Sequence, residues 1–104
     1  MGEIEYEIPG EKGYYNLSML RYKNKCKKYN VSDLINQPLP VTAIISSGRL
    51  KRLRMVVVGN PGVKVYVNGS EKKGKKIDIL LYPYDEVVFS LGEGGADYKI
   101  RYKI

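Results

Sequence analysis

The sequence predicts one mostly β domain, a β-sandwich or small barrel of about seven short strands with one helix near the N-terminus. Three observations support this: short runs of alternating apolar and polar residues, turn signals between the runs, and ten tyrosines against one phenylalanine and no tryptophan. The 104 residues fit the commonest size of a single domain, and no linker or repeat is evident. We therefore expect residues 1–104 to form one domain.

The first expected strand covers residues 3–8. Ile4, Tyr6 and Ile8 alternate there with glutamates, and Pro9–Gly10 ends the run, which is typical of a strand with one buried face. The other expected strands are residues 41–46, 50–58, 63–68, 77–82, 86–91 and 97–104.

The second and third of these strands are expected to form a hairpin around a Ser–Ser–Gly turn. Successive side chains of a strand point to opposite faces. Leu53, Met55 and Val57 should therefore share the buried face, and Arg52 and Arg54 should share the exposed face.

Residues 14–29 are expected to form the helix. Apolar residues recur there at intervals of four, three, four and three, at Tyr15, Met19, Tyr22, Cys26 and Tyr29. Lysines crowd the far end, where cations suit the helix dipole, and Asn30 can end the helix. The alternation of Tyr15, Leu17 and Met19 also suits a strand. If the helix packs on an open antiparallel sheet, the alternative class is α+β.

Charge is distributed unevenly along the chain. Residues 1–11 contain four glutamates and no base, and residues 77–104 contain five acids and three bases. Residues 12–76 contain fifteen lysines and arginines against two acids, a charge of +13. Such a segment favours polyanions, and it can also pair in part with the acidic ends of its own chain.

Three basic clusters are the best functional signal, at residues 21–28, 49–54 and 72–76. Lysine and arginine neutralise phosphates, and tyrosine rings can stack on bases. The expected nucleic-acid-binding residues are Arg21, Lys25, Lys28, Arg49, Lys51, Arg52, Arg54, Tyr66, Lys72, Lys73, Lys75 and Lys76. The other interpretation of these clusters is a solvated, lysine-rich surface with structural tyrosines.

Most catalytic chemistry is excluded by composition. The chain has no histidine, so Ser-His and Cys-His nucleophile pairs and histidine-based zinc sites are absent. Cys26 is the only cysteine, so an internal disulfide cannot form. We expect no enzyme activity, no metal and no cofactor.

One short pattern resembles known families. Val65–Tyr66–Val67–Asn68–Gly69, followed by Asp85–Glu86–Val87, is similar to a hairpin of S4-type RNA-binding modules and to the later strands of ubiquitin-like β-grasp domains. Tyr84 stands where those families usually have glycine, and the helices of the S4 module have no counterpart. No family is therefore assigned.

The function expected from the sequence is that of a binding module without catalysis. The first hypothesis is nucleic-acid binding through a basic surface with little sequence specificity. The alternatives are a structural or assembly subunit, such as a virion or tail component, and a regulator that docks on an acidic protein. No membrane segment or signal peptide is expected, which indicates a cytoplasmic or virion-associated setting.

Overall fold

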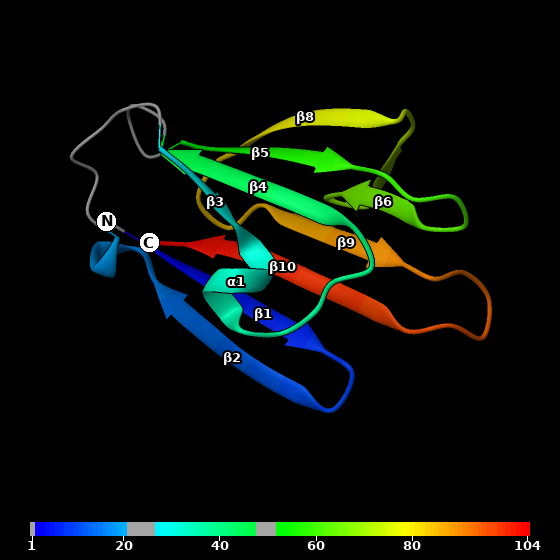
Figure 1. Ribbon diagram of the computed structural model, residues 1–104, viewed down its shortest axis with the longest axis horizontal. Helices are drawn as coiled ribbons and strands as arrows, with labels where there is room; N and C mark the ends of the chain where they lie inside the picture. The colour runs from blue at the N-terminus through cyan, green and yellow to red at the C-terminus, as the bar shows by residue number, and fades with distance from the viewer. Residues whose placement is uncertain (1, 21–26, 48–51) are drawn as a thin grey trace.

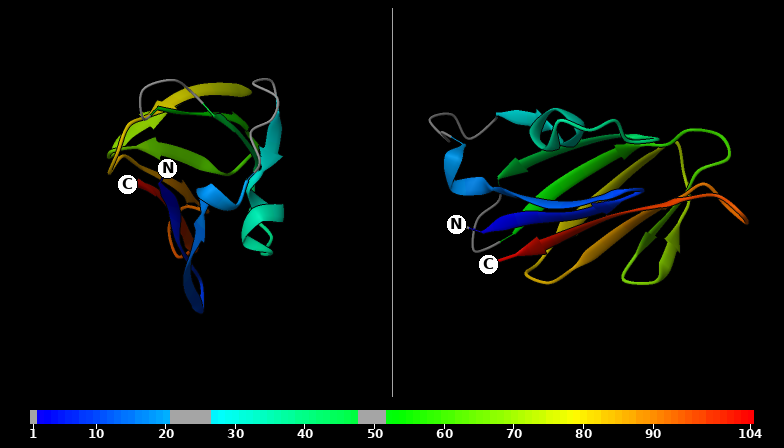
Figure 2. Two further views of the ribbon diagram at one scale, coloured as in Figure 1. Left: turned by 90° about the vertical axis from the view of Figure 1, so that its left-hand side faces the viewer. Right: turned by 90° about the horizontal axis from the view of Figure 1, so that it is seen from below.

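Two antiparallel sheets enclose one hydrophobic core in the computed structural model, which describes residues 2–20, 27–47 and 52–104 (Figures 1 and 2). Sheet A has six strands in the order β2-β1-β10-β9-β6-β7, and sheet B has four in the order β3-β4-β5-β8. The mostly β class with one short helix is confirmed.

The strands of sheet A are β1 (Glu3–Ile8), β2 (Glu11–Asn16), β6 (Lys64–Val67), β7 (Ser70–Lys72), β9 (Glu86–Ser90) and β10 (Asp97–Lys103). The strands of sheet B are β3 (Lys28–Asn30), β4 (Thr42–Ser47), β5 (Leu53–Val58) and β8 (Lys76–Leu81). A 3₁₀ turn, η1 (Leu17–Met19), follows β2, and the helix α1 (Val31–Ile35) follows β3.

All seven expected strands are present, as β1, β4, β5, β6, β8, β9 and β10, within the described residues. The β4–β5 hairpin is also confirmed, because the two strands pair from Thr42↔Val58 to Ser47↔Leu53. Leu53, Met55 and Val57 are buried, whereas Arg54 is exposed, as the alternation predicts.

The expected helix over residues 14–29 is wrong for the part that the structure describes. Residues up to Asn16 belong to β2. The apolar residues spaced as in a helix do not share a buried face, because Met19 is 72% exposed while Leu17 and Leu20 are buried. Tyr22 and Cys26 lie outside the described residues. The helix is instead α1, which begins at Asn30, whose side chain accepts a hydrogen bond from the Ser32 amide, and ends at a left-handed residue, Asn36.

β2 is held against β1 by a tight hairpin and a close contact. Gly10 has a positive φ of 81° in the two-residue connection, which pairs Ile8 with Glu11. The Tyr6 ring covers Gly13 directly opposite, where a Cβ atom would stand 2.5 Å from the Tyr6 hydroxyl. That hydroxyl donates to Glu11, and burial, followed by the Glu11 charge, raises the pKa of Tyr6.

β1 and β10 are interior strands of sheet A, so both termini of the described chain contribute to the core. Ile4 and Tyr6 of β1 and Ile100 and Tyr102 of β10 are buried, and Ile4 pairs with Tyr102. Burial raises the pKa of the Tyr102 hydroxyl. Ile104, the last residue of the expected strand 97–104, is 53% exposed beyond the end of β10.

The side chain of Asn68 joins the turn between β6 and β7 to the start of β9. Asn68 and Gly69 both have positive φ, 49° and 84°, which suits the tight turn between β6 and β7. The Asn68 side chain accepts from the Glu86 amide at 2.9 Å and donates to the Asp85 carboxylate at 3.1 Å. Hydrogen bonds between these two segments therefore explain why asparagine stands at position 68 and aspartate at position 85.

Replacing Ile100 tests the core assignment. Ile100→Ala should lower the free energy of unfolding by about 2–5 kcal/mol, and Ile100→Val by about 0.5–1.5 kcal/mol, because each leaves unfilled space in the centre of the molecule. Lys99→Ala, one residue away on the outer face, should change the free energy by less than about 0.5 kcal/mol. Urea denaturation measures all three. Equal effects of the changes at positions 99 and 100 would contradict the strand orientation.

Candidate nucleic-acid interface

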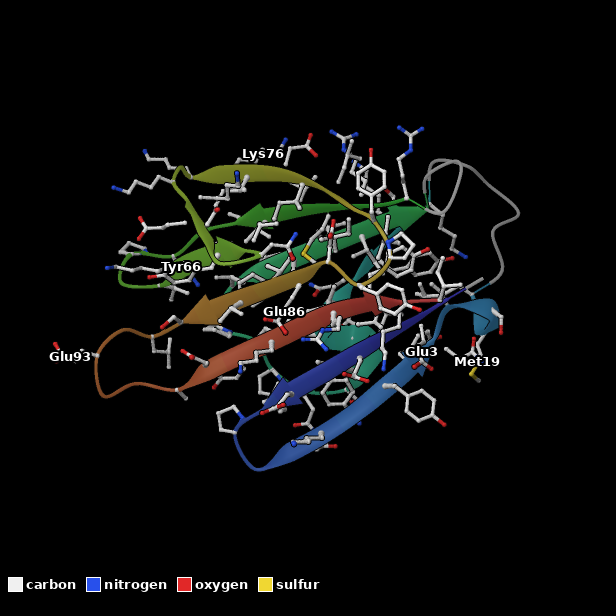
Figure 3. The ribbon with its side chains drawn as sticks, turned by 180° about the vertical axis from the view of Figure 1, so that it is seen from behind. Glu3, Met19, Tyr66, Lys76, Glu86 and Glu93 are labelled. Carbon is white, nitrogen blue, oxygen red and sulfur yellow. The ribbon has the colours of Figure 1, made fainter. Side chains whose placement is uncertain are left out.

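The outer face of sheet A carries alternating charges that neutralise one another. β1 lies between β2 and β10; its three glutamates stand opposite bases of β10, and Glu7 also stands opposite Lys12 of β2. The Lys103 ammonium lies 3.0 Å from the Glu5 carboxylate, and Arg101 lies 2.7 Å from Glu86. Lys12 and Glu7 form a longer pair at 3.8 Å. Most of the glutamates at the start of the chain therefore have partners within sheet A. Glu3 and Glu86 of this sheet lie on the near side of Figure 3.

The outer face of sheet B is basic. Strand register aligns Ser46, Arg54 and Leu80 in one row, and Lys28 of β3 extends that row. Lys76 lies further along β8 on the same outward side as Leu80. A shallow hollow of about 140 Å³ is lined by Lys28, Ile44, Ser46, Arg54, Val56 and Lys76. We call Lys28, Arg54 and Lys76 the basic face.

Arg54 is oriented by Asp78. Its Nε donates to one carboxylate oxygen at 3.0 Å, and its Nη2 donates to the other. The hydrogen bonds from Arg54, aided by its charge and that of Lys76, hold the pKa of Asp78 below its ordinary value. Both side chains are about half exposed, so the remaining guanidinium hydrogens face solvent and can reach an anion.

A second basic feature lies at the end of the sandwich near the β5–β6 and β7–β8 connections. These connections meet where the Gly59 amide donates to the Lys75 carbonyl at 2.9 Å. They border a groove of about 530 Å³. Its lining includes the apolar residues Val58, Pro61, Val63, Val65 and Ile77 and the four lysines Lys64, Lys72, Lys73 and Lys75. We call this feature the lysine groove.

The charges of the lysine groove are only partly compensated. Glu71 lies 4.0 Å from Lys64 and 3.6 Å from Lys73. Lys72 and Lys75 form no ion pair among the described residues. Lys72 stands opposite Val65, whose side chain is buried, so it lies on the inner side of edge strand β7, next to the groove.

The structure separates the site residues expected from the sequence into three groups. Lys28, Arg54 and Lys76 belong to the basic face, and Lys72, Lys73 and Lys75 line the lysine groove. Arg52 lies directly before β5, two residues from Arg54. Tyr66 lies on the outer side of sheet A, opposite Glu71 and Val88, away from the basic face. Arg21, Lys25, Arg49 and Lys51 lie outside the described residues. Figure 3 shows Lys76 and Tyr66 on different strands.

Three residues of this surface were not expected from the sequence: Ser46, Lys64 and Tyr82. Tyr82 is 48% exposed and directly follows β8, the strand that carries Lys76 and Leu80. The signal for Tyr82 in the sequence was the two-residue period of a strand, which relates Lys76, Leu80 and Tyr82. Ser46 and Lys64 could not be found in this way, because their places depend on which strands become neighbours.

Comparisons with known proteins add no assignment. The sequence matches no protein-family model, and searches of the curated proteins and of the solved structures find no match. Among the described residues, no three side chains of His, Cys, Asp or Glu are grouped so as to hold a metal. In the same part of the chain, no helix has the length and apolar character needed to cross a membrane.

The Arg54–Asp78 pair predicts a pH effect. Because the pKa of Asp78 is lowered on folding, the pair stabilises the fold above the ordinary carboxyl pKa of 3.8, and this is lost as pH falls through the lower folded value. Arg54→Gln should move the Asp78 titration, followed by NMR of its carboxyl carbon, upward towards 3.8. Arg101→Gln, which frees Glu86 instead, should leave that titration in place. An unchanged Asp78 titration in Arg54→Gln would refute the pairing.

Proposed function

We propose that the protein binds nucleic acid through the basic face and the lysine groove, with little sequence specificity. The observation that supports this proposal is that lysines and arginines from distant parts of the sequence lie on sheet B and at the neighbouring end of the sandwich. Of these, Lys28, Lys72, Lys75 and Lys76 form no ion pair within the described chain. Phosphates replace such missing counterions, and the release of condensed cations from the polymer drives binding.

Low specificity follows from the kinds of groups presented. Lysines are flexible point charges, and contacts to phosphate carry no base code. A helix whose bases reach the edges of the base pairs is one common reader of the major groove of a duplex. Within the described residues the α-helix is α1 alone, which has five residues and contains no base. The role proposed is therefore binding along a backbone.

The arrangement of acids favours this proposal over assembly of identical copies. An assembly driven by charge would need an acidic surface on one copy to meet the basic face of the next. The glutamates of β1 are the densest acidic run of the sequence, and Glu5 and Glu7 are already paired with Lys103 and Lys12. Docking on an acidic protein is the remaining competitor, and binding measurements distinguish it.

Salt dependence is the direct test of the proposal. Fluorescence anisotropy with a labelled DNA duplex at several salt concentrations should give a log–log slope of about −0.9 per neutralised phosphate. Lys28→Gln with Lys76→Gln should flatten the slope by about two units if each lysine meets one phosphate. Neither lysine forms an ion pair with the residues that the structure describes, so the loss is a loss of binding charge.

The matched control removes the same charge from the other side of the molecule. Lys12→Gln with Lys99→Gln, on the outer face of sheet A, should leave the slope unchanged. Equal slopes for the two double variants would remove the basic face from the proposal. The absence of binding to DNA or RNA at low salt would refute nucleic-acid binding altogether and favour an acidic protein partner.

A further inference from the structure

The turn between β8 and β9 presents two exposed tyrosines directly after β8, the strand that carries Lys76 of the basic face. Tyr82 is 48% exposed and Tyr84 is 65% exposed. Pairing of β5 with β8 places Leu80 opposite Arg54 and ends with Leu53↔Leu81. Tyr82 follows the end of β8, two residues after Leu80.

Tyr84 occupies a backbone position that suits glycine. The Asp85 amide donates to the Tyr82 carbonyl at 3.0 Å, which closes a four-residue turn with Pro83 second and Tyr84 third. Tyr84 has a φ of 73°, as the third residue of a type II turn requires. Glycine or asparagine is usual there, and a bulky side chain at positive φ is strained.

The turn itself does not need the tyrosine ring. Its backbone is fixed by the bond from the Tyr84 amide to the Tyr102 carbonyl at 2.6 Å and from the Tyr102 amide to the Asp85 carbonyl at 3.0 Å. The Asp85 carboxylate accepts from the Tyr82 amide at 2.9 Å. Glycine at position 84 would keep all of these bonds. A strained residue with a mostly exposed ring indicates a role outside the fold.

We propose that this turn is a binding site for unpaired nucleobases, with Tyr82 and Tyr84 as stacking surfaces beside the basic face. This inference rests on the proposed function and specifies its substrate class as single-stranded nucleic acid. Stacking on a side chain requires a base that is free of its partner, whereas phosphates are available in both single strands and duplexes. The hydrogen-bonded turn holds the tyrosine backbone in place before binding, which lowers the entropy lost on association.

The test compares Tyr84→Gly with the unchanged protein. The probe is a fluorescein-labelled DNA of mixed sequence and about 20 nucleotides, longer than a site of ~4–16 nucleotides, used alone or annealed to its complement. Tyr84→Gly should weaken single-strand binding by roughly 5- to 100-fold, which corresponds to the loss of one stacked base. Duplex affinity should change by less than about twofold, because the phosphate contacts remain. The melting temperature should stay equal or rise, because glycine relieves the strain at positive φ.

Two further variants complete the experiment. Tyr82→Leu, which leaves the positive φ at position 84 untouched, should also weaken single-strand binding selectively. Tyr14→Leu removes another exposed tyrosine, which lies opposite Glu5 on the far face of sheet A, and should change neither affinity.

The outcomes separate this inference from the proposed function. Unchanged single-strand affinity in Tyr84→Gly and Tyr82→Leu, or equal losses for single strands and duplexes, would refute the stacking site while salt-dependent binding remained. A lower melting temperature of Tyr84→Gly would show that the ring stabilises the fold and would also refute the inference. If neither DNA bound the unchanged protein at low salt, the proposed function itself would fail.

Discussion

The antiparallel pairing of β1 with β10 determines how charge is arranged over the molecule. It aligns Glu3, Glu5 and Glu7 with Lys103, Arg101 and Lys99 on the outer side of sheet A. Of these acids, Glu5 forms an ion pair with Lys103 of β10, and Glu7 forms one with Lys12 of β2. With those acids engaged, the bases of the middle of the chain dominate the outer side of sheet B. The proposed interface is a consequence of this strand pairing.

Alternation made most strands predictable, and its absence explains those that were missed. β1, β5 and β8 have a buried residue at every second position, so their sequences predict both the strand and its inward face. β7 is short and wholly exposed, and β2 contains Gly13 and has no fully buried residue. Such edge strands form because a neighbouring strand pairs with their backbone. The spacing of Tyr15 and Met19 imitated a helix, but strand pairing with β1 decided the conformation up to Asn16.

The candidate site was predictable only as a set of charges. The sequence indicates that Arg52 and Arg54 share a face, because they are two residues apart on one strand. It does not reveal that Lys28 and Lys76 join them, since that depends on the strand order β3-β4-β5-β8. Tyr66 was expected beside these bases and lies instead on sheet A, whereas Tyr82 directly follows β8, the strand that carries Lys76. Neighbour relations between distant strands are tertiary information, which local patterns do not contain.

Mapping the bound polymer on the protein shows which face of the molecule it contacts. In an NMR titration of the ¹⁵N-labelled protein with a short single-stranded oligonucleotide, the account predicts that signals of β5, β8 and the β7–β8 and β8–β9 connections shift together. Signals of β2, the edge strand of sheet A, and of its neighbour β1 should remain in place. Shifts concentrated on β1 and β2, or spread evenly over both sheets, would contradict the assignment of the basic face as the interface.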